Sequence, residues 1–193
     1  MKVKWWLTVG RLSAKWLFWL RFWQRVSTLV FSTFFTKVLN DSDRHLRDAD
    51  TDFAYTYAKS QLLQAGINLT GDIRVALVMT NTTADTEKDV NTVSAFGTLD
   101  ECDGANYVRK ALANEAVTED EANDRGEFDA DNVTWTALGS GTRQVQGAIV
   151  YLHVIDDTDS VPIAWIDTGG FPFDGGGADI TIQWNAEGII QAS

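Results

Sequence analysis

Apolar and polar positions alternate along many short segments after about residue 67, which is the pattern of β-strands with one face toward a core. The pattern predicts strands over 72–80, 93–99, 107–117, 133–138, 146–155, 161–167 and 179–184. Polar or glycine-rich turns separate several of these segments. Short strands with such turns favour a mainly β protein whose residues 67–193 form an antiparallel β-sandwich or jelly-roll-like domain.

The same period of two predicts which side chains fill the core. Apolar residues occupy every second position in four of the predicted strands, so they share one face of each strand. We expect the buried set to include Val75, Leu77, Ile149, Tyr151, Ile163, Trp165, Ile180 and Ile182.

A helical pattern precedes the strands. Phe53, Tyr57 and Leu62, with alanines between them, predict a short helix that ends near Gly66. The segment just before it is rich in aspartate, and the character of the chain changes abruptly there. We therefore expect residues 41–66 to be a linker with a short helix.

Residues 1–40 have a different composition from the rest of the chain. They contain seven basic residues, no acidic residue and five of the eight tryptophans. At about 100° per residue the basic side chains gather on one arc of a helix, while Trp16, Trp19 and Trp23 lie on another face. The segment is predicted to be a basic amphipathic helix, and these three tryptophans are its candidate partner-binding residues.

Three interpretations of this segment remain open. In the first, the segment is an arm that packs on a neighbouring subunit. In the second, which is equally favoured, it is a translated upstream extension, and the working protein starts near residue 38. The third, less favoured, is a helix that lies on a membrane surface. Basic residues interrupt every apolar stretch before it reaches the length of a membrane span, so a transmembrane helix is not expected.

The charge of residues 41–193 excludes one class of partner. This part holds nine basic and 27 acidic residues, a net charge of −18. Nucleic-acid binding depends on Lys and Arg displacing counterions from phosphates, so the acidic body is not expected to bind nucleic acid. Cys102 is the only cysteine and the two histidines are far apart in sequence. An intrachain disulfide is excluded, and neither a metal nor another cofactor is predicted.

Acidic residues offer the nearest approach to a metal or catalytic motif. Glu127, Asp129 and Asp131 alternate like the start of a calcium loop. Asn132 stands where the turn glycine belongs, and Leu138 stands where the bidentate glutamate belongs. A polar strand entry is therefore the favoured interpretation.

Other candidate chemistry is also weak. Adjacent acids such as those at 119–121 point in different directions from a loop, which favours a solvated face over a glycosidase pair. The glycine-rich run 168–177 lacks the Gly-Lys-Ser/Thr ending of a phosphate loop and is expected to be a long connection between strands. No Ser, Cys or His centre has a supporting motif. No catalytic residue is predicted, and the protein is not expected to be an enzyme.

An ordered series of segments resembles a family of small virion structural proteins of tailed bacteriophages, related to head-decoration (cement) proteins. The segments are DIRVALV (72–78), YVRKAL (107–112), FDADNVTW (128–135), QGAIVY (146–151), PIAWID (162–167) and DITIQWNAEG (179–188). The resemblance runs from about residue 60 to the end, about two-thirds of the chain. It implies a β-sandwich without cofactor or catalytic residues, found in the virion and, during assembly, in the host cytoplasm. Its implied partners are the major capsid protein or other virion subunits, including copies of itself.

Three functions follow in order of preference. The first is a capsid decoration subunit, which needs a rigid fold with edges and loops that bury surface on neighbouring subunits. The second is a tail or neck module that binds a receptor or glycan, with Trp135, Trp165 and Trp184 as aromatic platforms. Their alternating positions place these tryptophans in a core more often than on a surface. The third is a carboxylate-dependent glycan hydrolase.

Overall fold

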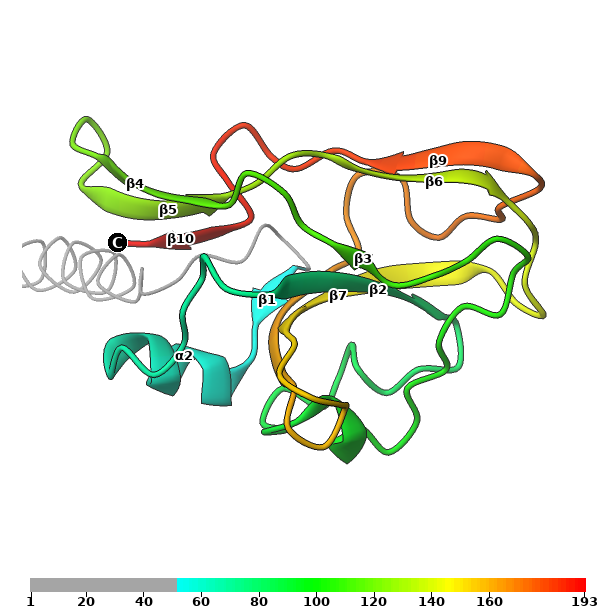
Figure 1. Ribbon diagram of the computed structural model, residues 1–193, viewed down its shortest axis with the longest axis horizontal. Coiled ribbons are helices and arrows are strands. Elements are labelled where there is room, and N and C mark those ends of the chain that lie inside the picture. The colour runs from blue at the N-terminus through cyan, green and yellow to red at the C-terminus, as the bar shows by residue number, and fades with distance from the viewer. Residues whose placement is uncertain (1–51) are drawn as a thin grey trace, which may run out of the picture. The chain divides into compact units, whose positions relative to one another are not determined.

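Short antiparallel strands dominate the computed structural model, which describes residues 52–193 (Figure 1). All described residues belong to one unit that spans Arg44–Ser193. In chain order the elements are β1 (Phe53–Ala54), α2 (Thr56–Leu63), β2 (Ile73–Met79), η1 (Val93–Ala95), β3 (Lys110–Ala111), β4 (Ala116–Asp120), β5 (Arg125–Asp129), β6 (Val133–Leu138), β7 (Val145–Leu152), β8 (Val161–Ile166), β9 (Ala178–Ile182) and β10 (Ile190–Ala192). The prediction of a mainly β protein with antiparallel sheets and little helix is confirmed.

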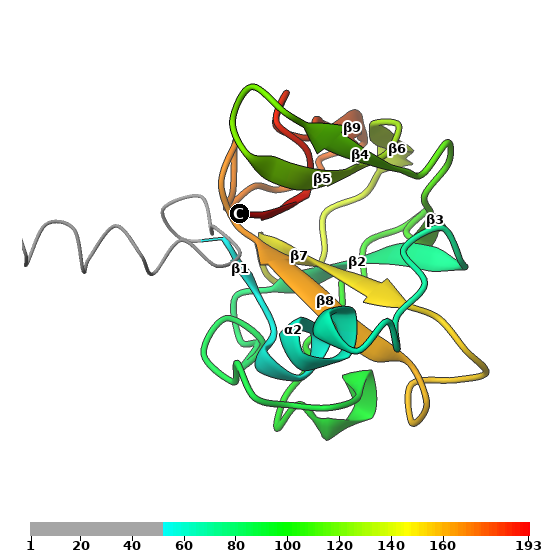
Figure 2. The same cartoon turned by 90° about the vertical axis from the view of Figure 1, so that its left-hand side faces the viewer.

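The strands form two layers in a sandwich-like arrangement (Figures 1 and 2). The lower sheet has the order β1-β8-β7-β2-β3, and every neighbouring pair is antiparallel. The upper layer consists of two smaller sheets, β10-β5-β4 and β6-β9. Because β5 leads into β6 and β9 leads into β10, the two small sheets follow one another along this layer.

Both faces of the lower sheet are buried. Pairing in register places Ala76, Ile149 and Trp165 on one face, and Leu77 and Ala148 on the other. All five are almost completely buried. The upper layer covers one face, and α2 with the loops around η1 lies on the other side of the sheet (Figure 1). This double coverage explains why β2, β7 and β8 are nearly continuous apolar runs.

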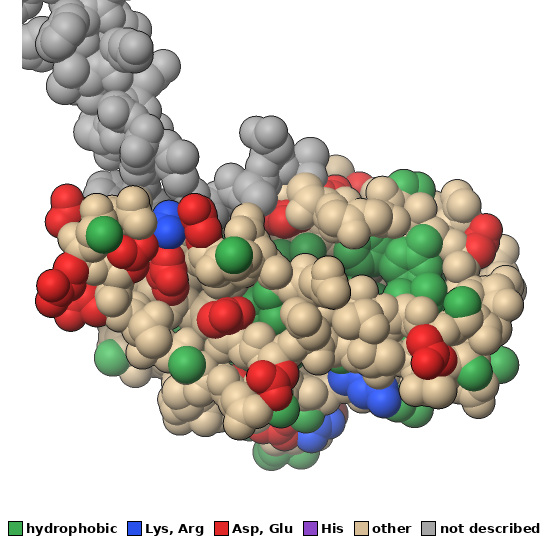
Figure 3. Space-filling model, turned by 90° about the horizontal axis from the view of Figure 1, so that it is seen from above, with side chains coloured by type: hydrophobic (Ala, Val, Ile, Leu, Met, Phe, Trp, Pro, Cys, Tyr) green, Lys and Arg blue, Asp and Glu red, His purple; other side chains and the backbone are tan. Residues whose placement is uncertain are grey.

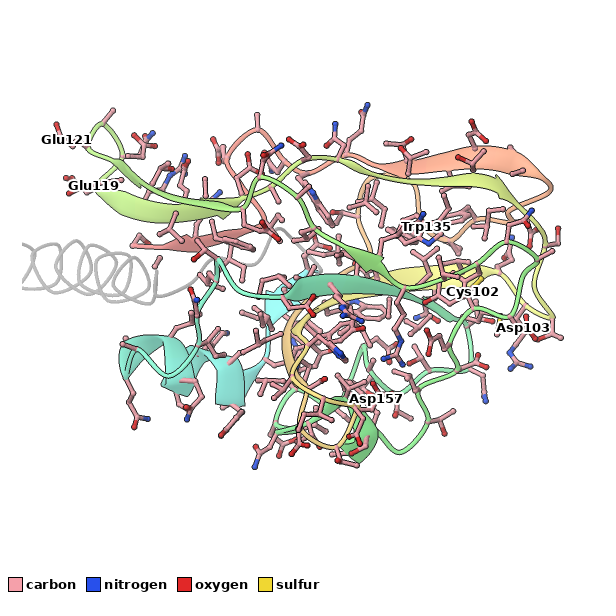
Figure 4. All side chains as sticks on the ribbon, viewed as in Figure 1. Cys102, Asp103, Glu119, Glu121, Trp135 and Asp157 are labelled. Carbon is pink, nitrogen blue, oxygen red and sulfur yellow. The ribbon has the colours of Figure 1, made fainter. Side chains whose placement is uncertain are left out.

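The predicted core set is largely correct. Seven of its eight side chains are buried, with exposed fractions between 0% and 7%, and Ile180 is half-buried. Trp135 lies between the two layers and is 0% exposed (Figure 4). Its indole Nε1 donates to the Val108 carbonyl oxygen at 2.7 Å, so the one polar atom of this ring has a partner.

The predicted strand over 93–99 is wrong, because these residues form η1 and a loop. Side-chain oxygens replace strand partners here: the Glu87 carboxylate accepts from the Thr83 hydroxyl at 2.7 Å and from the Gly97 amide at 2.8 Å. Such local bonds give the backbone an alternative to a sheet. Val93 and Phe96 are still buried, so the apolar pattern correctly indicated burial but not the backbone conformation.

The predicted strand over 107–117 is also wrong in its extent. Asn106 and Asn114 have positive φ angles of 64° and 55°, and only the short β3 lies between them. The hairpin of β4 and β5 was not predicted as a unit. Its strand β4 is exposed at four of five positions, so no apolar alternation indicates it.

The short helix is confirmed with altered bounds. Phe53 and Ala54 pair with β8 as β1, so α2 begins only at Thr56. The helix ends as Ala65 takes a positive φ of 54° and the Gly66 amide donates to the Gln61 carbonyl oxygen at 2.7 Å.

Several predictions fall outside the described residues. The amphipathic helix of residues 1–40, the candidate residues Trp16, Trp19 and Trp23, and the start of the linker at 41 all stay predictions. Within residues 52–193, no helix has the length and apolar character needed to cross a membrane.

Candidate functional site: an open groove between strand edges

A groove of about 460 Å³ opens where the edges of the two layers meet. We call it the open groove. Its wall is formed by the end of β8, the connection from β8 to β9, β9 itself and the segment that leads into β10; the lining residues are 52–54, 164–166, 168–171, 173, 179–185 and 188–191. On the face that carries the upper layer, apolar side chains gather in a hollow (Figure 3).

Unpaired strand edges border this groove. In the described part of the chain, β9 pairs only with β6, and β10 pairs only with β5. On the lower sheet, β1 covers β8 for two residues, at Phe53 and Ala54. Within residues 52–193, the outer edges of β9 and β10 therefore have no neighbouring strand.

The direction of the backbone amides in β9 follows from the hydrogen bonds around it. The Trp184 amide donates to Asn132 Oδ1 at 3.1 Å, on the β6 side. Successive amides of an extended strand point to opposite sides, so the amides of Thr181 and Gln183 point away from β6 and into the groove. Gln183 forms no hydrogen bond with any residue of the described region.

Asp52 closes the groove next to the end of β8. Its carboxylate accepts from the amides of Asp167 at 2.7 Å and Thr168 at 3.1 Å, and from the Thr168 hydroxyl at 2.7 Å. Burial raises the pKa of this carboxyl above its ordinary value, although the three hydrogen bonds oppose the shift. The ionised group is therefore held in a partly desolvated position.

Aromatic rings form part of the groove wall. The rings of Phe171 and Phe173 lie 5.2 Å apart between centroids. Phe173 also exchanges backbone hydrogen bonds with Val145 at 2.8 and 3.0 Å, which fixes this part of the connection to β7. The indole of Trp184 donates to the Asp131 carbonyl oxygen at 2.9 Å. The predicted connection over 168–177 is thus an aromatic segment packed on a neighbouring strand.

The groove is acidic as well as apolar. Asp52 and Asp179 line it, and none of its described lining residues is Lys or Arg. Residues 52–193 as a whole hold seven basic and 23 acidic residues, a net charge of −16. Such a site disfavours anionic ligands and favours neutral or cationic ones.

The three tryptophans considered as platforms have different environments. Trp135 and Trp165 are 0% and 1% exposed and belong to the core, as their alternation favoured. Trp184 is half-buried and lines the open groove. Alternation alone does not separate these cases, because the exposure of each ring depends on whether another layer covers it, as it does for Trp135.

Nucleophile chemistry is disfavoured at Cys102. Its side chain is 5% exposed, and burial raises the pKa of the thiol, with Asp103 and Glu101 adding to the shift. The thiol therefore stays protonated, whereas the thiolate is the nucleophile.

A serine–histidine contact that the sequence did not indicate is present in the loop between β7 and β8. Ser160 Oγ lies 3.3 Å from His153 Nδ1. However, Ser160 is 0% exposed, and its hydroxyl donates to the Asp156 carbonyl oxygen at 2.6 Å. The hydroxyl fastens a tight loop and has no access to a substrate.

The alternating acids of the calcium-like segment have separate protein partners. Glu127 pairs with Arg125 at 2.8 Å, Asp129 accepts from the Ala130 amide, and Asp131 accepts from the Asn114 side chain at 2.6 Å. Among residues 52–193, no group of three or more His, Cys, Asp or Glu side chains is placed to hold a metal ion.

Comparison of the chain with protein-family models, with curated proteins and with solved structures found no match. The fold and the groove themselves define the class: a mainly antiparallel β protein with one open, acidic and partly aromatic side.

Proposed function

We propose that this chain is a non-catalytic structural subunit of a tailed-phage particle, and specifically a capsid decoration or cement subunit that binds neighbouring capsid proteins. The finer description of its body as a virion-type β-sandwich or jelly roll is part of the same proposal. Support comes from the ordered segments that resemble those of a family of virion structural proteins, together with the sandwich-like arrangement of antiparallel sheets.

One observation carries the proposal: the open groove borders unpaired strand edges of the described region, and its lining residues form no catalytic constellation. A cleft with strand edges on two sides is suited to contact with another polypeptide. A structural subunit needs this kind of surface, because its role is to bury area on neighbouring subunits.

Protein composition of purified particles tests this function. We expect the chain to be present in copy numbers comparable to those of the major capsid protein. Its absence from particles refutes the proposal, and a few copies per particle would reassign it to the neck or tail.

A second candidate, a glycan-binding module of the tail, is favoured by three aromatic residues that line the open groove, Phe171, Phe173 and Trp184. Sugars stack on aromatic faces, and the amides of Gln183 and Asn185 lie within the same groove. A glycan array with wild-type chain and Trp184→Ala tests it. Binding that is lost in the variant supports the glycan function, and an empty array rejects it.

A further inference from the structure

We infer that the open groove accepts an extended polypeptide strand of a partner protein, with basic and apolar side chains, and that this strand pairs with the free edge of β9. The inference rests on the proposed function, since it names the kind of segment by which a neighbouring subunit is bound. Main-chain hydrogen bonds with β9 provide the binding, and the side chains of the groove select the charge and shape of the partner strand.

Backbone geometry provides the first reason. The amides of Thr181 and Gln183 point into the groove at alternate positions, which is the spacing by which one β-strand offers donors to the next. Unsatisfied backbone groups in a recess are costly unless water or another chain pairs with them. An added strand would supply carbonyl oxygens at this same spacing.

Two edge strands of the upper layer, β4 and β9, differ in their protection. Edge strand β4 ends at a tip that carries Glu119 and Glu121, and this hairpin projects away from the body (Figure 4). Charges of this kind keep an exposed edge from pairing with other chains. Edge strand β9 has the sequence ADITI, with Asp179 as its only charged residue, and that carboxylate accepts from the Ala137 amide at 2.8 Å. Of β4 and β9, the strand on the groove is therefore the one left able to pair.

Charge selects the occupant. Asp52 and Asp179 line the groove, and no basic residue of the described region accompanies them. A second copy of the body would bring its net charge of −16 against an equal charge, so self-pairing of these edges is disfavoured. A strand with lysine or arginine at its groove-rim positions and apolar residues toward Phe171 and Ile180 complements both features.

Binding of synthetic peptides to the full-length chain tests the inference. The first probe is a short peptide of alternating lysine and valine. The second has glutamate in place of lysine, and the third is the first peptide N-methylated at every internal residue, which removes its backbone donors. We expect the first to bind and the other two to bind at least about tenfold more weakly, because they lose charge complementarity or main-chain hydrogen bonds.

Two substitutions at Gln183 locate the pairing. Gln183→Ala keeps the groove-facing amide and removes only the side chain, which forms no hydrogen bond within residues 52–193. It should therefore weaken binding less than Gln183→Pro does. Gln183→Pro removes the groove-facing donor without removing the Trp184 bond to Asn132, and should weaken binding by about tenfold. Circular dichroism checks that both variants keep the fold.

Hydrogen exchange of the wild-type chain gives a readout that does not depend on a variant. The amides of Thr181 and Gln183 should exchange more slowly when the lysine–valine peptide is bound. Equal binding of the N-methylated peptide, or unchanged exchange at both amides, overturns the inference.

If the groove binds something other than a partner strand, the exchange experiment gives a different result, and each such result also overturns the inference. Slow exchange of the two amides in concentrated protein without peptide would assign the edge to a second copy. Protection by an oligosaccharide, with none by peptide, would assign the groove to a glycan. Failure of these peptide experiments leaves the particle-composition test untouched, so the two proposals fail separately.

Discussion

Replacement of Arg109 by methionine is expected to lower the free energy of unfolding by about 3 kcal/mol. Arg109 connects two loops on the lower side of the five-stranded sheet. Its Nε and Nη2 atoms donate to the Glu101 carboxylate, both at 2.7 Å, and Nη2 also donates to Asp157 Oδ2 at 2.8 Å. The guanidinium further lies 5.4 Å from the centroid of the Tyr151 ring.

The expected magnitude follows from the burial of these groups. The side chains of Arg109, Glu101 and Asp157 are 21%, 28% and 34% exposed, so the pairs are partly screened by solvent. A charge-assisted hydrogen bond contributes about 1.5–3 kcal/mol. Loss of Arg109 removes the ion-pair partner of both carboxylates, although Glu101 keeps the hydrogen bond from the Tyr107 hydroxyl at 2.8 Å. Two such losses, discounted for partial exposure, give about 3 kcal/mol. Methionine preserves most of the apolar stem against Tyr151, so packing is little changed.

Arg74→Met is the matched control. Among residues 52–193, the ion-pair partner of Arg74 is the nearby Asp72, at 2.7 Å, and the two side chains are 34% and 45% exposed. Its loss should lower the unfolding free energy by less than about 1 kcal/mol. Urea unfolding of both variants measures the difference, and the double variant with Glu101→Gln should show a coupling energy of about 1–3 kcal/mol with Arg109. Equal losses at Arg109 and Arg74, or zero coupling, would refute the reasoning.

Two further predictions concern packing and pH. Gly147→Ala should lower the free energy of unfolding by about 1–3 kcal/mol, because an added Cβ would lie 2.4 Å from Trp165 Cζ2. Gly126→Ala is the control, since its Cβ would meet only one atom, at 3.9 Å. It should change the free energy of unfolding by under about 0.5 kcal/mol in urea titrations. Hydrogen bonds from the Arg143 side chain and the Asn81 amide hold the pKa of Asp100 below its ordinary value. The stability of the wild-type chain should therefore fall as pH drops below about 4. Urea titrations from pH 6 to 3 should show a smaller fall for Asp100→Asn.

The sequence predicted the strands that have an apolar face toward the core. In β6, Val133 and Trp135 face the core and Thr134 faces solvent, so period two is visible. The exposed hairpin of β4 and β5 has no such pattern. Arg125, which pairs with Asp120, Glu127 and Glu187, joins that hairpin to the end of the chain, and no local rule indicates these partners.

The open groove depends on long-range pairing and could not be predicted. It brings Asp52 against Thr168, 116 positions later in the chain. Its donors are backbone amides of Thr181 and Gln183, which carry no sequence signal. Their availability follows from the absence of a strand beyond β9 in the described region, a property of the assembled sheets rather than of any segment.

Asp52 gives a pH test at the groove itself, with a sign opposite to that of Asp100. Burial raises the pKa of the Asp52 carboxyl in the folded chain above its ordinary value. The folded state then binds more protons than the unfolded state between those two pKa values, so this group removes stability as pH rises through that window.

Asp52→Asn abolishes this ionisation and keeps the partners. The amide oxygen can still accept from the backbone amides of Asp167 and Thr168, while the new NH₂ donates to the Thr168 hydroxyl. The stability of the variant relative to wild type should therefore increase as pH rises from about 4 to 7, measured by urea unfolding at each pH. Asp52→Ala, which does not ionise either and loses the acceptor altogether, should be less stable than Asp52→Asn by about 1–2 kcal/mol at every pH. A stability difference between the asparagine variant and wild type that stays constant or falls with pH would show that the carboxylate is not held in a desolvated position beside the groove.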